Sequence, residues 1–239
     1  MLLALTGAAG CLDAIGYLAL GHVFTANMTG NTVLLGLHLS QEQGAAAVLA
    51  LIALFGFGGG LLIGALVVER SPDAAPWPKS VTRALALEVV ILAVFTIGYA
   101  LTTVIREVWE GQALIALSAI AMGIQSAAAR RLDVPGIATT YLTGTLTSAV
   151  TGLVAKSRRS SRTAAAVEAA AASQPGRRQV RLQILALVVY GLGALIAGLV
   201  QSGWPKLVAI LPLAVVAAVV TIAPVLIHHR GTSQVGTGG

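Results

Sequence analysis

The chain has 239 residues, 56% of them hydrophobic and only 10% charged, whereas a soluble domain usually carries about a quarter of charged residues. We therefore exclude a water-soluble fold and expect the lipid bilayer to be the solvent of most of the chain. The net charge of +6 does not predict a nucleic-acid partner, because the basic residues stand in loops beside apolar segments and not on a soluble surface.

The apolar segments predict an all-α, polytopic membrane helix bundle, and residues 1–104 form its first membrane repeat. The chain opens without the basic region of a signal peptide, so we expect its first segment to be an ordinary membrane helix. The segments of this half are a helix at about 2–19, a non-helical break at about 20–27, a half-length helix at about 28–39, and long helices at about 45–68 and 81–104.

Residues 111–227 repeat this order of segments and form a second membrane repeat. Its segments are a helix at about 111–130, a break around Pro135 and Gly136, a half-length helix at about 140–155, and helices at about 182–202 and 206–227. The basic loop 156–181 separates the half-length helix from the last two helices, and we expect the Gly/Ser/Thr-rich tail 228–239 to be disordered.

Two pairs of similar segments relate the halves. The segment Thr25–Thr32 has a residue pattern similar to that of Thr139–Thr145, 114 positions later. The segment Phe57–Val67 aligns without gaps on Tyr190–Val200, with six of eleven residues identical. The aligned segments contain faces of small residues, for which we expect packing within the bundle and not a subunit interface. Polar, glycine-broken segments at matching places in two membrane halves are typical of a transporter's substrate site.

The Lys and Arg residues predict how the bundle is oriented. They gather in the loops 69–83 and 156–181 and near the C-terminus, which places these segments and both termini in the cytoplasm. The loops near residues 40, 107 and 204 are poor in Lys and Arg and are expected outside. The first broken unit then ends outside and the second ends inside, so we predict two inverted three-segment repeats, each with a re-entrant break in its first unit.

Short motifs in the first half resemble a known family. They are Asp13 with the following Ala-Ile-Gly-Tyr-Leu, then Gly-His-Val-Phe at 21–24 and Met-Thr-Gly-Asn-Thr at 28–32. Over roughly residues 5–225 the chain resembles the YoaK-like family of bacterial integral membrane proteins, a domain of unknown function. The resemblance implies a multi-pass protein of the bacterial inner membrane and implies no established substrate.

The starts of the two half-length helices are the candidate substrate site. The first N–H groups of a helix lack internal partners and carry partial positive charge, so a helix start inside the membrane attracts an anion or a carbonyl. An alternative is that these polar residues only cap helices and satisfy freed backbone groups. The candidates are Asn27, Thr29, Gly30, Asn31 and Thr32 in the first half and Tyr141, Thr143, Gly144 and Thr145 in the second.

Asp13 is the candidate proton-coupling residue, because an ionisable group inside a span is costly unless it is paired or functional. The alternative is a structural pair with His22 or a capping role. The matching position in the second half is near Gln125, which keeps polarity and loses charge. Tyr17 could wall the pocket, and His22 could contact the ligand. For Glu88 we expect snorkelling or a pair with Arg83 or Arg130, and less readily proton transfer.

The chain shows no catalytic motif and no nucleotide-binding loop, so we predict that it is not an enzyme. No cofactor or metal site is predicted, and Cys11, the only cysteine, excludes a disulfide within one chain. The leading interpretation is a proton-coupled secondary transporter for a small polar or anionic solute. A passive channel and a non-transporting membrane scaffold are the alternatives. Whether the protein forms a homo-oligomer stays open.

Overall fold

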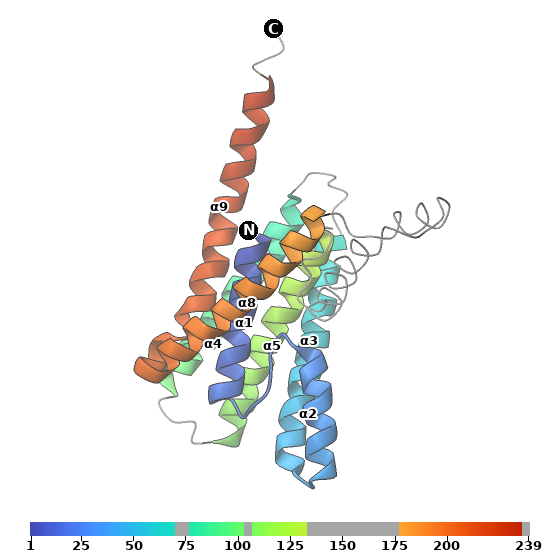
Figure 1. Ribbon diagram of the computed structural model, residues 1–239, viewed down its shortest axis with the longest axis vertical. Coiled ribbons are helices and arrows are strands. Elements are labelled where there is room, and N and C mark those ends of the chain that lie inside the picture. Colours follow the sequence, from blue (N-terminus) through green and yellow to red (C-terminus); the bar gives the residue numbers. More distant parts are fainter. Residues whose placement is uncertain (70–76, 103–106, 133–176, 236–239) are drawn as a thin grey trace, which may run out of the picture.

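The computed structural model describes residues 1–69, 77–102, 107–132 and 177–235, and every regular element in these ranges is a helix (Figure 1). The all-α architecture is therefore confirmed for this part of the chain. The elements are α1 (Leu2–Ala19), α2 (Met28–Ser40), α3 (Gly44–Glu69), α4 (Lys79–Leu101), α5 (Val108–Arg131), α8 (Arg177–Gly203), the 3₁₀ helix η2 (Pro205–Leu207) and α9 (Ile210–Val235).

Six of the described helical segments are long and apolar enough to cross a membrane. They are Leu2–Ala19, Gly44–Glu69, Lys79–Leu101, Val108–Arg131, Arg181–Gly203 and Pro205–Ala223. Helix α2 is not among them, because its 13 residues reach only about 20 Å at 1.5 Å per residue, against a hydrocarbon core about 30 Å thick.

Residues 20–27 break the helical unit between α1 and α2, as the sequence predicts. Gly21 and His22 adopt left-handed backbone conformations, with φ of 90° and 60°, which turn the chain sharply after α1. In Figure 1 the linker returns from the end of α1 toward the middle of the bundle, and α2 then runs alongside α3. The first broken unit thus has a half-length helix that starts at mid-height of the bundle.

The structure corrects one sequence expectation, and several others concern residues outside the described ranges. The tail was expected to be disordered from residue 228, but α9 continues to Val235. The segment 228–235 contains no proline and a single glycine, and extending an existing helix needs no new nucleus. The second break, the helix at about 140–155 and the site candidates Tyr141, Thr143, Gly144 and Thr145 lie outside the described residues.

The core contains two helix pairs that meet backbone to backbone, α1 with α8 and α3 with α5. A Cβ atom added to Gly60 of α3 would lie 2.1 Å from the carbonyl oxygen of Ile120 in α5. A Cβ atom added to Gly193 of α8 would lie 2.2 Å from the carbonyl oxygen of Gly7 in α1. Only glycine permits such approaches, and the expectation that these glycines pack within the bundle is confirmed.

The two pairs have the same contacts at matching positions. A Cβ atom on Gly10 would lie 2.1 Å from the carbonyl oxygen of Tyr190, and one on Gly123 would lie 2.2 Å from that of Phe57. Phe57 and Tyr190 are the matched first positions of the eleven-residue alignment. These contacts match each residue of α1 with the residue 113 positions later in α5. Asp13 therefore corresponds to Ser126, and Gln125 stands one position before Ser126.

Helices α4 and α9 complete the described bundle. Helix α4 packs against α5 and α9, and its Thr96 hydroxyl donates to the carbonyl oxygen of Ala209 at 3.0 Å. Nearer the end of α4, the Tyr99 hydroxyl donates to Oε1 of Gln201 at 3.0 Å. In Figure 1, α8 crosses α1 diagonally and the last turns of α9 extend beyond the other helices.

Candidate functional site

Asn31 fixes the shape of the break from the first turn of α2. Its Oδ1 accepts from the N–H of Phe24 at 2.8 Å, and its Nδ2 donates to the carbonyl oxygen of Phe24 at 2.6 Å. Asn31 is fully buried, so these bonds replace the water that the non-helical backbone lacks inside a membrane. Asn31, predicted as a substrate-binding residue, therefore uses both ends of its side-chain amide in hydrogen bonds within the protein.

Asp13 holds the next two residues of the break from α1. Its Oδ1 accepts from the N–H of Thr25 at 2.7 Å and from the N–H of Ala26 at 2.6 Å. Its Oδ2 accepts from the hydroxyl of Tyr190 in α8. Asp13 is buried, with 3% of its surface exposed, and each of its oxygens has a donor. The carboxyl group thus joins three parts of the bundle: α1, the break and α8.

The alternative pair between Asp13 and His22 is not formed. His22 lies on the exposed side of the left-handed turn, with its ring edge on Tyr17 at 5.0 Å between centroids. The turn carries His22 away from the buried face of α1 on which Asp13 lies. The imidazole of His22 therefore does not reach the buried carboxyl group of Asp13.

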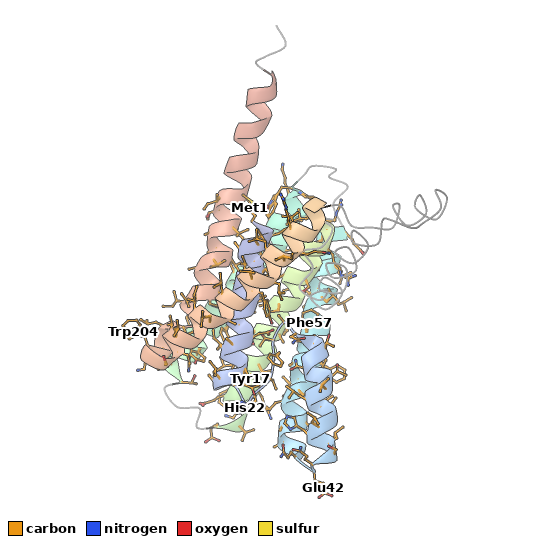
Figure 2. All side chains as sticks on the ribbon, viewed as in Figure 1. Met1, Tyr17, His22, Glu42, Phe57 and Trp204 are labelled. Atoms are coloured by element: carbon orange, nitrogen blue, oxygen red, sulfur yellow. The ribbon has the colours of Figure 1, made fainter. Side chains whose placement is uncertain are left out.

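Tyr17, His22 and Phe24 form an aromatic cluster beside the start of α2. Tyr17 stacks on Phe24 at 5.6 Å between ring centroids and is 44% exposed. A Cβ atom on Gly30 would lie 2.8 Å from Cδ2 of Phe24. The structure therefore brings two of the predicted site residues, Tyr17 and Gly30, against the ring of Phe24, and His22 packs on the other predicted residue, Tyr17. Figure 2 shows Tyr17 and His22 next to each other near the end of α1.

The start of α2 has fewer free N–H groups than an uncapped helix. Oδ1 of Asn27 accepts from the N–H of Gly30 at 3.1 Å, and the carbonyl oxygen of Asn27 accepts from Asn31 at 3.2 Å. The N–H of Met28 bonds to the carbonyl oxygen of Ala26 at 3.2 Å. Within the described ranges, only Thr29 of this turn leaves its N–H without an acceptor. Asn27 therefore caps α2, and one open donor remains in this turn.

Asn27, Thr29 and Thr32 lie on the exposed side of this helix start. The Thr32 hydroxyl donates to the carbonyl oxygen of Met28 at 3.0 Å, and the hydroxyl still offers lone pairs to a ligand. The open N–H of Thr29 thus lies on an exposed helix start that carries polar side chains, and Phe24 packs on the neighbouring Gly30. This arrangement suits one carboxylate, phosphate or carbonyl oxygen at the positive end of a helix.

Gln125 does not join this site. Its Nε2 donates to the carbonyl oxygen of Leu5 at 3.1 Å, and its buried Oε1 has no partner among the residues described. Leu5 lies eight residues before Asp13, about 12 Å along α1. Gln125 therefore ties α5 to α1 at another level of the bundle.

Glu88 contradicts its sequence expectation. Its side chain is fully buried, and neither carboxyl oxygen has a hydrogen-bond partner within the described part of the chain. Arg83 and Arg130, the expected partners, are exposed. Position 88 faces the packed centre of the bundle, so the side chain is too short to reach the surface.

Tyr190 and Phe24 are the site residues that sequence reasoning missed. Tyr190 did leave a signal: in the eleven-residue alignment its partner is Phe57, so the pair differs by one hydroxyl group. A hydroxyl added to an apolar membrane position needs an acceptor, and Asp13 is that acceptor. Phe24 left no comparable signal. The described residues contain no group of His, Cys, Asp and Glu that could hold a metal ion.

Six membrane-length helices and a broken helical unit define a multi-pass membrane protein. Residues 1–223 match the family described as "Protein of unknown function (DUF1275)". The chain is also 38% identical over 215 residues to the UPF0700 transmembrane protein YoaK of Bacillus subtilis (strain 168), covering 90% of this chain and 89% of that protein. The chain therefore belongs to the DUF1275 family, and the expected resemblance is confirmed. No solved structure matches it.

Proposed function

We propose that this membrane protein is a secondary transporter, coupled to protons, for a small polar or anionic solute. The observation that carries the proposal is the broken unit formed by α1, the break and α2. Its half-length helix starts at mid-height of the bundle with an open N–H at Thr29, beside exposed polar and aromatic side chains. Non-helical backbone at membrane depth is tolerated where it lines a cavity or is buried in protein, and in transporters it forms the substrate site.

The two glycine-rich helix pairs support an inverted-repeat design. In this design α1 corresponds to α5 and α8 corresponds to α3. Gly10 of α1 makes the same backbone contact as Gly123 of α5, and Gly193 of α8 makes the same contact as Gly60 of α3. In Figure 1, α1 and α8 run toward one end of the bundle and α3 and α5 run toward the other. Opposite directions with equal contacts are what an inversion produces. Such repeats allow alternating access by movement of one part against the other.

The solute in this proposal binds at the start of α2. Thr29 supplies its N–H, Asn27 and Thr32 supply polar side chains, and Tyr17 and His22 wall one side with Phe24. The partial positive charge of the helix start favours an anionic group or a carbonyl oxygen. We propose that Tyr141, Thr143, Gly144 and Thr145 complete the site from the second half of the chain.

Asp13 supports the coupling part of the proposal. In its ionised form it accepts three hydrogen bonds, from Thr25, Ala26 and Tyr190. Hydrogen bonds to a charged acceptor are about twice as strong as neutral ones, so protonation of Asp13 weakens its hold on the break. Because the break leads directly into α2, a proton on Asp13 would change the position of the solute site relative to α8.

We also propose that the protein lies in a bacterial inner membrane with both termini in the cytoplasm. The ends of α3, α5 and α9 and the starts of α1, α4 and α8 share one end of the bundle in Figure 1. This end carries Lys79, Arg130, Arg131 and Arg181, whereas Lys206 stands in η2 at the opposite end. An excess of Lys and Arg on one side supports a cytoplasmic location of that side.

A non-transporting scaffold is the second candidate, and one observation favours it. Asn31 and Asp13, two of the buried polar residues of the broken unit, use their side chains in hydrogen bonds within the protein. A scaffold would need the break only to hold helices together. It predicts that no small solute stabilises the protein.

The test combines a binding screen with a matched pair of variants. Purified protein is screened by thermal shift against amino acids, carboxylates and phosphate across pH, and solutes that bind are tested for uptake into proteoliposomes. Gly30→Leu should abolish binding, because its side chain collides with Phe24 at the helix start. Gly36→Leu is the control, since a Cβ atom at Gly36 of the same helix meets nothing within 4 Å.

Three results would contradict the proposal. Binding that persists in Gly30→Leu removes the solute site from the start of α2. Absence of any solute-dependent shift or uptake favours the scaffold. If Asp13→Asn keeps accumulation driven by a pH gradient, Asp13 does not couple protons, because an amide keeps the shape and cannot titrate.

A further inference from the structure

Glu88 is the second acid inside a described span, and its surroundings differ from those of Asp13. It is the tenth residue of α4, about 14 Å along the helix from Lys79, and so lies near the middle of the span. Its side chain is fully buried, and its two oxygens have no hydrogen-bond partner among the described residues. Asp13, by contrast, has a donor for each oxygen.

The helices packed on α4 bring no cation to Glu88. Those described are α3, α5, α9 and the short η2. Their charged residues with described side chains lie at the helix ends: Glu69 in α3, Glu110, Arg130 and Arg131 in α5, and Lys206 in η2. The sequence of α9 has no titratable residue between Ile210 and Ile227, and in α4 itself Lys79 and Arg83 are exposed.

An ionised carboxyl group in this position would be a buried charge without a counter-ion or a donor. Such a charge is far more costly than the neutral acid, which loses only modest hydrogen bonding on burial. Replacing the acid by an apolar residue would remove even that cost. The position nevertheless holds a glutamate, and a proton is the smallest partner that removes the charge.

We propose that Glu88 is a proton-binding site of the bundle, which carries a proton in this conformation and releases it when α4 moves against α5 and α9. On release the O–H bond of the Glu88 carboxyl breaks, the electron pair stays on the carboxylate oxygen, and the proton passes to water. In the described conformation the two acids differ: each oxygen of Asp13 has a hydrogen-bond donor, whereas Glu88 has none and is neutral in this proposal. The use of this proton in coupling rests on the proposed transport function, whereas its presence on Glu88 does not.

Ser80 supports this placement from the same face of α4. It lies eight residues before Glu88, two helical turns away, and its buried hydroxyl oxygen likewise has no partner within the described ranges. Ala84, between them, is small and fully buried. The described part of α4 thus has two buried polar side chains without a hydrogen-bond partner.

Infrared spectroscopy of the full chain in lipid at neutral pH tests the proposal, because the C=O band of a protonated carboxyl is separate from carboxylate and amide bands. The expected result is one such band, shifted in D₂O, that is lost in Glu88→Gln and retained in Asp13→Asn. Circular dichroism and size-exclusion chromatography check that each variant is folded. Glu88→Met replaces Glu88→Gln if the unpaired amide unfolds the protein.

The proposal is overturned if the wild type has no protonated-carboxyl band, or if the band survives both substitutions of Glu88. It is also overturned if the band disappears in Asp13→Asn. The band reports the proton whether or not a solute moves. A retained band together with a failed solute screen would therefore refute the transport function alone.

Discussion

The α1–α8 and α3–α5 pairs pack through the same backbone contacts, yet among the described residues only α1–α8 has an acid and a tyrosine that bond across the pair. Gly10 faces the carbonyl oxygen of Tyr190 as Gly123 faces that of Phe57. In the register set by these contacts, Asp13 and Tyr190 in one pair correspond to Ser126 and Phe57 in the other. The comparison separates packing, which both halves retain, from polar chemistry, which differs between them.

The difference follows from what each contact demands. A carbonyl oxygen about 2 Å from a Cβ position leaves no room for any side chain, so both pairs need glycine there. The position of Asp13 makes no such demand, because a serine or a carboxylate fits the same helix face. What decides it is the break: Thr25 and Ala26 need acceptors, and Asp13 supplies them.

The largest expected effect tests the shared packing. Gly10→Val and Gly123→Val should each destabilise the protein by about 4 kcal/mol or more, because each side chain would overlap a backbone carbonyl that cannot move without separating the helices. Thermal unfolding in detergent measures both. Gly58→Ala is the control and should stay within about 1 kcal/mol of the wild type, since a Cβ atom there meets nothing within 4 Å. Tolerance of one glycine variant alone would break the equivalence of the pairs.

The next effect tests the polar difference. Asp13→Ala should destabilise by about 3 kcal/mol, because it leaves the N–H groups of Thr25 and Ala26 and the hydroxyl of Tyr190 without an acceptor. Ser126→Ala should change stability by about 0.5 kcal/mol or less, as expected for a half-buried side chain with no hydrogen bond to another described residue. Equal losses in the two variants would show that Asp13 matters only for packing.

The smallest effect concerns the single hydroxyl that distinguishes Tyr190 from Phe57. Tyr190→Phe should cost about 2 kcal/mol, the usual contribution of a hydrogen bond to a charged group. Phe57→Tyr adds a hydroxyl to a half-buried position and should cost less than about 1 kcal/mol. The same unfolding assay measures both, and a neutral Tyr190→Phe would mean that the break is held by α1 alone.

Much of the described fold could be predicted from the sequence. The span positions, the break at 20–27 and the short length of α2 are confirmed to within a few residues. These features are local, because a run of apolar residues and its interruption by Gly, Asn and Thr can be recognised along the chain alone. The end of α9 was missed because helix extension past Ile227 depends on a turn already formed.

The candidate site was predicted only in part. The sequence by itself determined that Asp13, Asn31 and Gly30 belong to one broken unit, since they lie within twenty residues of one another. Only the tertiary structure decided what they do: Tyr190, 177 positions away, binds Asp13, and Phe24 packs on Gly30. It also decided that Glu88 is buried without a partner, because burial depends on which helix faces meet, and apolar helices show no face preference in their sequence.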